Sequence, residues 1–211
     1  MHIGWNQTIF LHHLPRSFTI QECDQLLSEQ ENFHPATILQ DTDDGVEQIV
    51  DTTYRHHDRS MGFDTDLSVR LYEKVKDTLP PVCFDEEKQP WKLVKMNPFM
   101  RYLRYSPGQF FKAHQDEATE LLDNNEGANG KLMSFITLQL YLSDNTEGAT
   151  AFYQHFPLVN HEKNDISTPD VKILPRKGDV VLFQHDLIHE GQPLLKEYKY
   201  TLRTDVLYRK A

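Results

Sequence analysis

A pair of potential metal ligands, His114 and Asp116, occurs in the stretch FKAHQDEATE, where one residue separates them. Residues i and i+2 of a β-strand point to the same face, so a strand here would direct both side chains toward one metal ion. The alternative is an exposed strand end with two ordinary polar residues, because an H-x-D triplet arises easily by chance in a chain with 11 histidines. A metal site therefore requires a third ligand from another part of the chain.

The stretch VVLFQHDLIHEGQP contains the two best candidates for that third ligand, His185 and His189. Their i, i+4 spacing would suit a zinc-binding helix, but the strand-like run 180–183 and the helix breakers Gly191 and Pro193 favour a strand end or a turn. The other histidines either stand in adjacent pairs, whose side chains diverge on an extended segment, or lack a second ligand-like residue nearby. These are His12, His13, His56 and His57 in pairs, and His2, His34, His155 and His161 as single residues.

The C-terminal half, from MRYLRYSPGQFFKAHQD to the end, carries several motifs in a recognisable order. YSPGQFFKAHQD is followed by SFITLQLYLSDNTEGATAFY and then by RKGDVVLFQHDLIHEGQPLLKEYKYTLRTDVLY. This order resembles the iron(II) and 2-oxoglutarate dependent dioxygenases, in particular their prolyl 4-hydroxylase-like branch. The resemblance identifies His189 as the third ligand beside His114 and Asp116, and it leaves His185 a structural or supporting role.

The chemistry of iron(II) explains why such a triad is useful. Two neutral imidazoles and one carboxylate occupy one face of an octahedral ion, which leaves three positions for a bidentate 2-oxo acid and dioxygen. A closed structural zinc site would use four protein ligands instead. The resemblance therefore implies an oxidoreductase that hydroxylates a C–H bond while 2-oxoglutarate and O2, its co-substrates, yield succinate and CO2. Ascorbate is a further candidate cofactor.

The resemblance also implies a basic residue about ten positions after the distal histidine, which binds the second carboxylate of 2-oxoglutarate. Lys199 is the first choice, and Arg203, which shares its strand face by the period of two, is the alternative. Tyr141 matches a position where the family often places a tyrosine hydroxyl on the same carboxylate. Tyr105 matches a tyrosine that lines the pocket, and Thr137 faces the same interior as Tyr141. Each tyrosine could instead be a core aromatic residue.

Two helices and a β-rich remainder must position these residues. TIQECDQLLSEQ contains a capping box, and DTDLSVRLYEKVKDTLPP has one apolar face and ends in two prolines, so both segments predict helices. Short runs rich in β-branched and aromatic residues follow from Lys92. The predicted strands are KLVKMN, MRYLRYS, FFKAHQD, SFITLQLYLS, ATAFYQH, DVKILPR, DVVLFQH and KYTLRTDVLYR.

We therefore predict a mainly β fold with flanking helices (α+β), in which N-terminal helices pack on one sheet of a double-stranded β-helix, or jelly roll. Residues 1–211 would form a single dioxygenase domain, with a helix-rich support region at 1–90 and a catalytic core at 92–211. Cys23 and Cys83 have no close metal-ligand or redox spacing, so we expect both thiols to be packing residues.

Composition and charge narrow the partners. The formal charge of −10 disfavours a nucleic-acid partner, although Arg203 and Arg209 are spaced like the arginine pair of nucleic-acid dealkylating dioxygenases. The N-terminus has no signal-peptide pattern, and no run approaches the ~18 apolar residues of a membrane span, so we expect a cytoplasmic protein without a membrane partner. The sequence does not indicate an oligomeric state.

The substrate class is the least determined property. A prolyl or other side chain of a protein or peptide is the leading candidate, and a free amino acid or small molecule is the alternative. A cupin-like metalloenzyme without 2-oxoglutarate and a non-catalytic jelly-roll binding module are further alternatives. Specificity would depend on residues 117–131, 154–170 and 54–63, and 117–131 would be either a lid over the metal or a surface loop.

Overall fold

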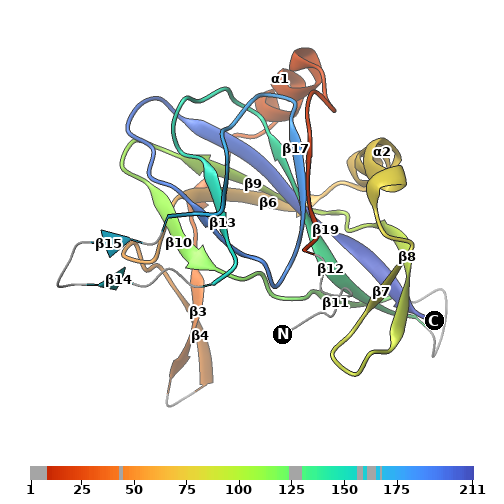
Figure 1. Ribbon diagram of the computed structural model, residues 1–211. Helices are drawn as coiled ribbons and strands as arrows, with labels where there is room; N and C mark the ends of the chain where they lie inside the picture. Colours follow the sequence, from red (N-terminus) through yellow and green to blue (C-terminus); the bar gives the residue numbers. More distant parts are fainter. Residues whose placement is uncertain (1–8, 43–44, 124–129, 156–158, 161–164, 167) are drawn as a thin grey trace.

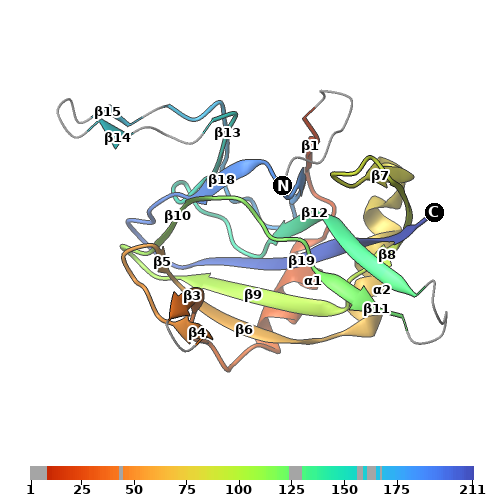
Figure 2. The same ribbon diagram turned by 90° about the horizontal axis from the view of Figure 1, so that it is seen from below.

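The computed structural model describes residues 9–42, 45–123, 130–155, 159–160, 165–166 and 168–211. Within these residues, a ten-stranded sheet and a five-stranded sheet lie face to face and form the body of the molecule (Figures 1 and 2). The central pairings of both sheets are antiparallel. The two sheets bring together segments that are far apart in the sequence, as the predicted metal site requires.

The larger sheet runs, in order, through β1 (Leu11–Leu14), β17 (Val180–Gln184), β12 (Lys131–Tyr141), β19 (Lys199–Lys210), β9 (Phe99–Tyr105), β6 (Asp58–Phe63) and β2 (His34–Pro35). Three strands attach to it: β11 (Glu120–Leu122) to β12, β8 (Pro90–Met96) to β19, and β7 (Val82–Phe84) to β8. The smaller sheet has the order β16 (Val171–Ile173), β13 (Thr150–Tyr153), β18 (Ile188–Gly191), β10 (Phe110–His114) and β5 (Arg55–His56). Separate two-stranded pairs are β3 (Ile38–Thr42) with β4 (Gly45–Ile49), and β14 (Val159–Asn160) with β15 (Asp165–Ile166).

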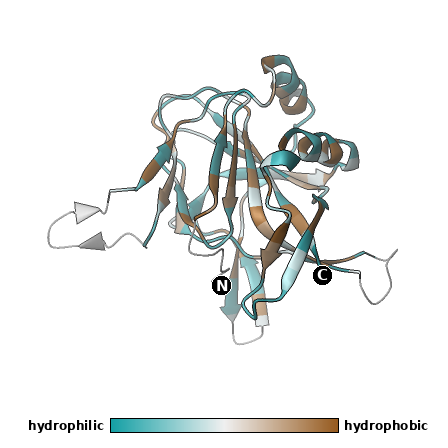
Figure 3. Cartoon of the chain, turned by 45° about the vertical axis from the view of Figure 1, so that its right-hand side comes forward, coloured by the Kyte–Doolittle hydropathy of each residue, from teal (hydrophilic) through white to brown (hydrophobic). Residues whose placement is uncertain are grey.

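Two helices pack on the same side of the larger sheet (Figures 1 and 2). The first, α1 (Ile20–Ser28), begins with the predicted capping box, in which the Thr19 hydroxyl accepts from the Glu22 amide. The second, α2 (Thr65–Val75), begins at Asp64, and a short 3-10 turn (Lys76–Thr78) follows it. Brown and teal residues alternate along both helices in Figure 3, as amphipathic helices require. No described helix has the length and apolar character needed to span a membrane.

The main core lies between these helices and the larger sheet. Leu71 and Val75 of α2 and Leu26 of α1 join Leu138 of β12 and Leu202 of β19 in one buried cluster. Cys23 and Cys83 are fully buried in this cluster, and burial raises the pKa of the Cys23 thiol to about 11. Both cysteines are therefore packing residues, as predicted.

The mainly β jelly roll with helices on one sheet is confirmed, and all eight predicted C-terminal strands are present. The prediction of a helix-rich region at 1–90 is incomplete, because the same region also supplies β1 to β7. These strands are short, and most of their residues are at least partly exposed, so they lack the apolar alternation that reveals a half-buried strand. The strand β18 was also not predicted, since it has only four residues.

Candidate metal centre and adjoining cavities

The three predicted ligands meet where β10 pairs with β18. His114 is the last residue of β10 and pairs in register with His189 of β18. Asp116 lies just beyond β10, where its backbone N–H donates to the carbonyl of His185 at 2.8 Å. One ligand atom from each of the three residues lies within 4.8 Å of the others. The i, i+2 reasoning thus identified a pair that converges, although Asp116 follows the strand and does not belong to it.

Both imidazoles are oriented by backbone carbonyls. The Nδ1 of His114 lies 2.7 Å from the carbonyl of Lys112, and the Nδ1 of His189 lies 2.9 Å from the carbonyl of Leu187. A carbonyl can only accept, so each Nδ1 carries the proton and each Nε2 keeps a lone pair. The two Nε2 atoms lie 3.7 Å and 3.6 Å from the same Oδ1 of Asp116. His114 Nε2 is buried without a hydrogen-bond partner.

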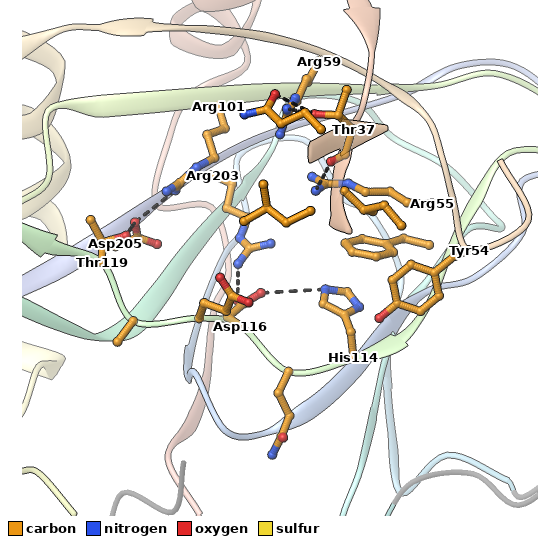
Figure 4. Close-up of a pocket in the computed structure, with 17 residues that line it drawn as sticks. Thr37, Tyr54, Arg55, Arg59, Arg101, His114, Asp116, Thr119, Arg203 and Asp205 are labelled. Atoms are coloured by element: carbon orange, nitrogen blue, oxygen red, sulfur yellow. Dashed lines mark hydrogen bonds and ion pairs between the residues drawn. The ribbon is translucent and has the colours of Figure 1, made fainter. Parts of the chain in front are cut away.

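The other carboxylate oxygen of Asp116 has its own partners. Oδ2 accepts from the Thr137 hydroxyl at 2.6 Å and forms an ion pair with Arg203 (Figure 4). Burial alone would raise the pKa of Asp116, but the Arg203 guanidinium and the neighbouring histidines outweigh burial and hold the pKa well below its usual range. Oδ1 is therefore a charged oxygen directed toward the two imidazoles.

This donor set fits a divalent transition metal. Burial lowers the pKa of His114 and of His189, so both imidazoles are neutral near pH 7 and able to donate a lone pair. Hydrogen bonds from the opposite ring nitrogen to a carbonyl are typical of metal-binding histidines. Two nitrogens and one oxygen are too few for a closed zinc site, and they match the facial triad of iron(II) oxygenases. His114 Nε2 is buried without a hydrogen-bond partner, and a metal ion bound at this point would explain why.

A narrow inner cavity of ≈ 20 Å³ lies beside His189 and contains Lys199. Lys199 is only 2% exposed, and its Nζ donates to the carbonyl of Gly148 at 2.9 Å. Among the described residues, no carboxylate pairs with this ammonium, and burial lowers its pKa to about 7. The Tyr105 ring lies 4.0 Å below Nζ. A buried cation without an anionic partner fits the distal carboxylate of a dicarboxylic acid.

Other polar groups surround the same cavity. The Thr201 hydroxyl is buried and has no partner in the described part of the chain. The Thr150 hydroxyl accepts from the Gln139 amide at 2.8 Å and from the Tyr141 hydroxyl at 2.7 Å, which leaves its own proton to donate. Sequence reasoning missed Thr150, Gln139 and Thr201 as candidate contacts. Thr201 and Gln139 had a signal, because the period of two places Thr201 between Lys199 and Arg203 on β19 and Gln139 between Thr137 and Tyr141 on β12.

The remaining predicted residues occupy different positions. Tyr105 lines the inner cavity, whereas Tyr141 lies behind Thr150, outside the lining. Thr137 and Arg203 hold the metal-ligand candidate Asp116. Arg209, the second arginine of the nucleic-acid alternative, lies 3.1 Å from Asp123. His185 is buried, and its Nε2 lies 3.9 Å from Asp205, in the supporting position that the resemblance implied.

A larger outer cleft of ≈ 560 Å³ also adjoins the metal-site residues (Figure 4). His114, Asp116 and Arg203 contribute to its floor, and Thr37, Ile38 and Gln48 reach it from the β3–β4 region. Three further arginines line the cleft: Arg55, Arg59 and Arg101. Of the predicted specificity segments, 54–63 and the first residues of 117–131 contribute to this lining. Residues 124–129 lie outside the described residues, as does most of 156–167.

Comparison with known families identifies a match over the C-terminal half. The model of the 2OG-Fe(II) oxygenase superfamily matches residues 100–204, which include all three candidate metal ligands as well as Lys199 and Arg203. No curated protein sequence matches the chain.

Several solved structures share this fold at low sequence identity. A prolyl-4-hydroxylase from Pseudomonas putida has 14% identity and a TM-score of 0.58, over 97% of this chain and 94% of that one. HygX from Streptomyces hygroscopicus, solved with nickel, 2-oxoglutarate and hygromycin B, has 19% identity and a TM-score of 0.57, over 97% and 84%. A prolyl hydroxylase from Trichoplax adhaerens, in complex with a hypoxia inducible factor peptide fragment, has 15% identity and a TM-score of 0.54, over 96% and 84%.

Proposed function

Because this chain belongs to the 2OG-Fe(II) oxygenase superfamily, we propose that it hydroxylates a C–H bond of an organic substrate, with His114, Asp116 and His189 as its iron ligands. The observation that carries the proposal is the pair of imidazole Nε2 atoms directed at one charged carboxylate oxygen, with the Nε2 of His114 buried and unpartnered. Iron(II), when bound with 2-oxoglutarate and O2, supplies an oxidative decarboxylation to succinate and CO2 that is coupled to hydroxylation.

The protein's own residues would bind and orient the reactants. Lys199 would form the salt bridge to the distal carboxylate of 2-oxoglutarate, while the Thr201 and Thr150 hydroxyls donate hydrogen bonds to it. Tyr105, packed against Lys199, keeps the ammonium aligned and excludes water. Thr137 and Arg203 hold Asp116 so that Oδ1 stays directed toward the metal position. An ammonium has three N–H donors, so Lys199 can bind the distal carboxylate of 2-oxoglutarate while its Nζ still donates to the Gly148 carbonyl.

A prolyl or other side chain of a protein or peptide is the substrate class that we propose first. An outer cleft of ≈ 560 Å³ beside the metal ligands is large enough for an extended segment of a few residues, and its lining includes the apolar Ile38 and Leu39 of β3 and the polar Gln48 of β4. A free amino acid or another small molecule is the second candidate, because the cleft also contains a cluster of charged side chains that would recognise a compact polar molecule.

Succinate formation tests the proposed reaction. The protein is loaded with Fe(II) under anaerobic conditions and then given 2-oxoglutarate, ascorbate and oxygen. We expect succinate from the wild type and none above background from His189→Ala. A cell extract treated with and without 2-oxoglutarate is then compared by mass spectrometry for a gain of one oxygen on peptides and on small molecules. Absence of succinate from a protein that binds iron would contradict the proposed function.

A further inference from the structure

Two arginines in the outer cleft differ from the other arginines around them. Arg101 and Arg203 each form an ion pair, with Asp205 and Asp116 respectively. Arg55 of β5 and Arg59 of β6 line the same cleft, yet neither lies within 4.0 Å of a carboxylate anywhere in the described part of the chain. The protein has a formal charge of −10, so acidic side chains are plentiful elsewhere. Two unpaired cations in the reaction cleft therefore need an explanation.

Both guanidinium groups converge on one residue, Thr37, just before β3 (Figure 4). Arg59 Nη2 donates to the Thr37 hydroxyl at 2.6 Å, and Arg55 Nη1 donates to the Thr37 carbonyl at 3.4 Å. Arg55 Nε also lies 3.4 Å from His57 Nε2. A guanidinium has five N–H donors, so these contacts orient each group and still leave donors for a ligand. The geometry is that of a held pair and not of two freely moving surface side chains.

The electrostatic surroundings of this pair are unfavourable without an anion. Burial lowers the pKa of Arg55 to about 10; the like charges of Arg203 and Arg59 act in the same direction, while Tyr105 and the Asp116 carboxylate oppose them. Burial also lowers the pKa of Arg59, with a smaller contribution from Arg101. Both groups nevertheless stay charged near pH 7. Partly buried like charges repel each other, and an oxyanion between them would relieve that repulsion.

The pair also lies at a useful distance from the metal ligands. The Arg55 guanidinium carbon is 4.7 Å from the centre of the Phe111 ring, and that ring stacks on the His114 imidazole with centroids 3.6 Å apart. One aromatic ring thus separates Arg55 from a metal ligand. Lys199 lies in the separate inner cavity, so an anion bound by Arg55 and Arg59 is distinct from the distal carboxylate of 2-oxoglutarate.

We infer that Arg55 and Arg59 form the substrate anchor of this enzyme and bind a carboxylate or phosphate group that the substrate carries beside its reacting C–H bond. This inference rests on the proposed function, and it narrows the substrate to acidic molecules: an acidic or phosphorylated peptide segment, or a small organic acid or phosphate ester. The planar guanidinium group of arginine binds both carboxylate and phosphate groups in bidentate geometry. Anchoring one end of the substrate would hold its C–H bond over the metal.

Direct binding of small anions tests the anchor. The protein is loaded with redox-inert Ni(II) and saturating 2-oxoglutarate, so that the inner site is filled, and is then titrated by calorimetry with benzoate and, separately, with inorganic phosphate. We expect saturable one-to-one binding of at least one probe, and the tighter probe identifies which oxyanion the anchor prefers. Absence of saturable binding of both probes would overturn the inference.

Variants then locate the binding. We expect Arg55→Gln/Arg59→Gln to weaken binding about tenfold or more, and Arg55→Lys/Arg59→Lys to recover part of the affinity, which separates a lost charge from a damaged fold. Arg70→Gln/Arg176→Gln removes the same two charges from exposed positions outside the cleft and should bind like the wild type. Equal weakening in this control pair, or unchanged binding in the glutamine variant, would overturn the anchor.

The two hypotheses fail separately. If the wild-type protein binds the probes through Arg55 and Arg59 but never forms succinate, the anion site is supported and the proposed reaction is contradicted. Conversely, if the protein converts 2-oxoglutarate to succinate but binds neither probe, the dioxygenase reaction is supported and the substrate anchor is contradicted. With both results positive, the substrate search is confined to the anionic fraction of a metabolite or peptide extract.

Discussion

The inner cavity and the outer cleft both adjoin the metal-site residue His114, and they are built differently. The inner cavity is narrow, and its polar residues come from long central strands, β12 and β19, and from β13 and β18. The outer cleft is wide, and its arginines Arg55 and Arg59 come from shorter N-terminal strands, β5 and β6. The long central strands β12 and β19 hold side chains more rigidly than the more exposed N-terminal strands do.

This difference separates two tasks of the proposed enzyme. A co-substrate that is always the same molecule needs one fixed cation in a closed space, which Lys199 provides at 2% exposure. A primary substrate needs room and adjustable contacts, which the cleft provides. If the two regions are independent, substitutions in the inner region will change metal or 2-oxoglutarate binding, and those in the outer region will change only recognition of the substrate.

The largest effect is expected at the candidate metal ligands, which lie beside both regions. Asp116→Ala removes the only carboxylate of the ligand set and leaves the buried Arg203 cation without its partner. We expect succinate formation to fall by about 10³-fold or more, together with a loss of Fe(II) affinity measured by calorimetry. The control is His34→Ala, an exposed residue of β2. Wild-type iron affinity in Asp116→Ala would exclude Asp116 as a ligand.

The next largest effect should separate Lys199 from Arg203. Lys199→Met removes the buried ammonium from the inner cavity, so we expect the Kd for 2-oxoglutarate to rise about a hundredfold while iron affinity changes little. Arg203→Met removes the ion pair with Asp116, so its main effect should be on iron affinity. Calorimetry with each ligand measures both quantities. The reverse pattern would make Arg203 the principal cation for 2-oxoglutarate.

A pH effect of smaller size should also be confined to the inner region. The pKa of Lys199 is lowered by burial to about 7, and a dianion binds its protonated form. Affinity for 2-oxoglutarate should therefore be highest below this pKa, where Lys199 is protonated. As the pH rises above the pKa of the free enzyme, affinity should fall about tenfold per pH unit until the pKa of Lys199 in the complex is reached. Lys199→Arg stays charged and should flatten this dependence. An equally steep fall in Lys199→Arg would assign it to another group.

The inner region could be predicted from the sequence to a larger extent than the outer one. The spacing of His114 and Asp116 and the period of two along β19 are local patterns, so they can be recognised in the sequence without knowledge of the fold. Thr201 follows from the same period once Lys199 is assigned to the interior. Local spacing does not reveal Thr150, because its position beside Gln139 depends on how the two sheets face each other.

The arginine anchor could not be predicted from local patterns. Arg55 and Arg59 are separated by a paired histidine segment that has no apolar alternation, and β5 and β6 belong to different sheets. They converge because β5 pairs with β10 and β6 pairs with β9, two contacts between segments far apart in the sequence. Thr37, which orients both guanidiniums, comes from a third segment. Such long-range pairings are beyond what a periodic pattern can indicate.

The smallest effect concerns Tyr141, whose hydroxyl reaches the inner cavity only through Thr150. Tyr141→Phe keeps the ring and removes the buried hydroxyl that lies 2.7 Å from Thr150 Oγ1 and 3.3 Å from the Ile173 carbonyl, so the free energy of unfolding should fall by about 1 kcal/mol or slightly more. Because Thr150 would only lose one of the groups that orient it, the Kd for 2-oxoglutarate should rise a few-fold, and less than in Thr150→Val. Chemical denaturation and calorimetry measure the two quantities. A rise as large as that of Lys199→Met would mean that the Tyr141 hydroxyl turns toward the co-substrate itself, and the inner cavity would then extend one residue deeper.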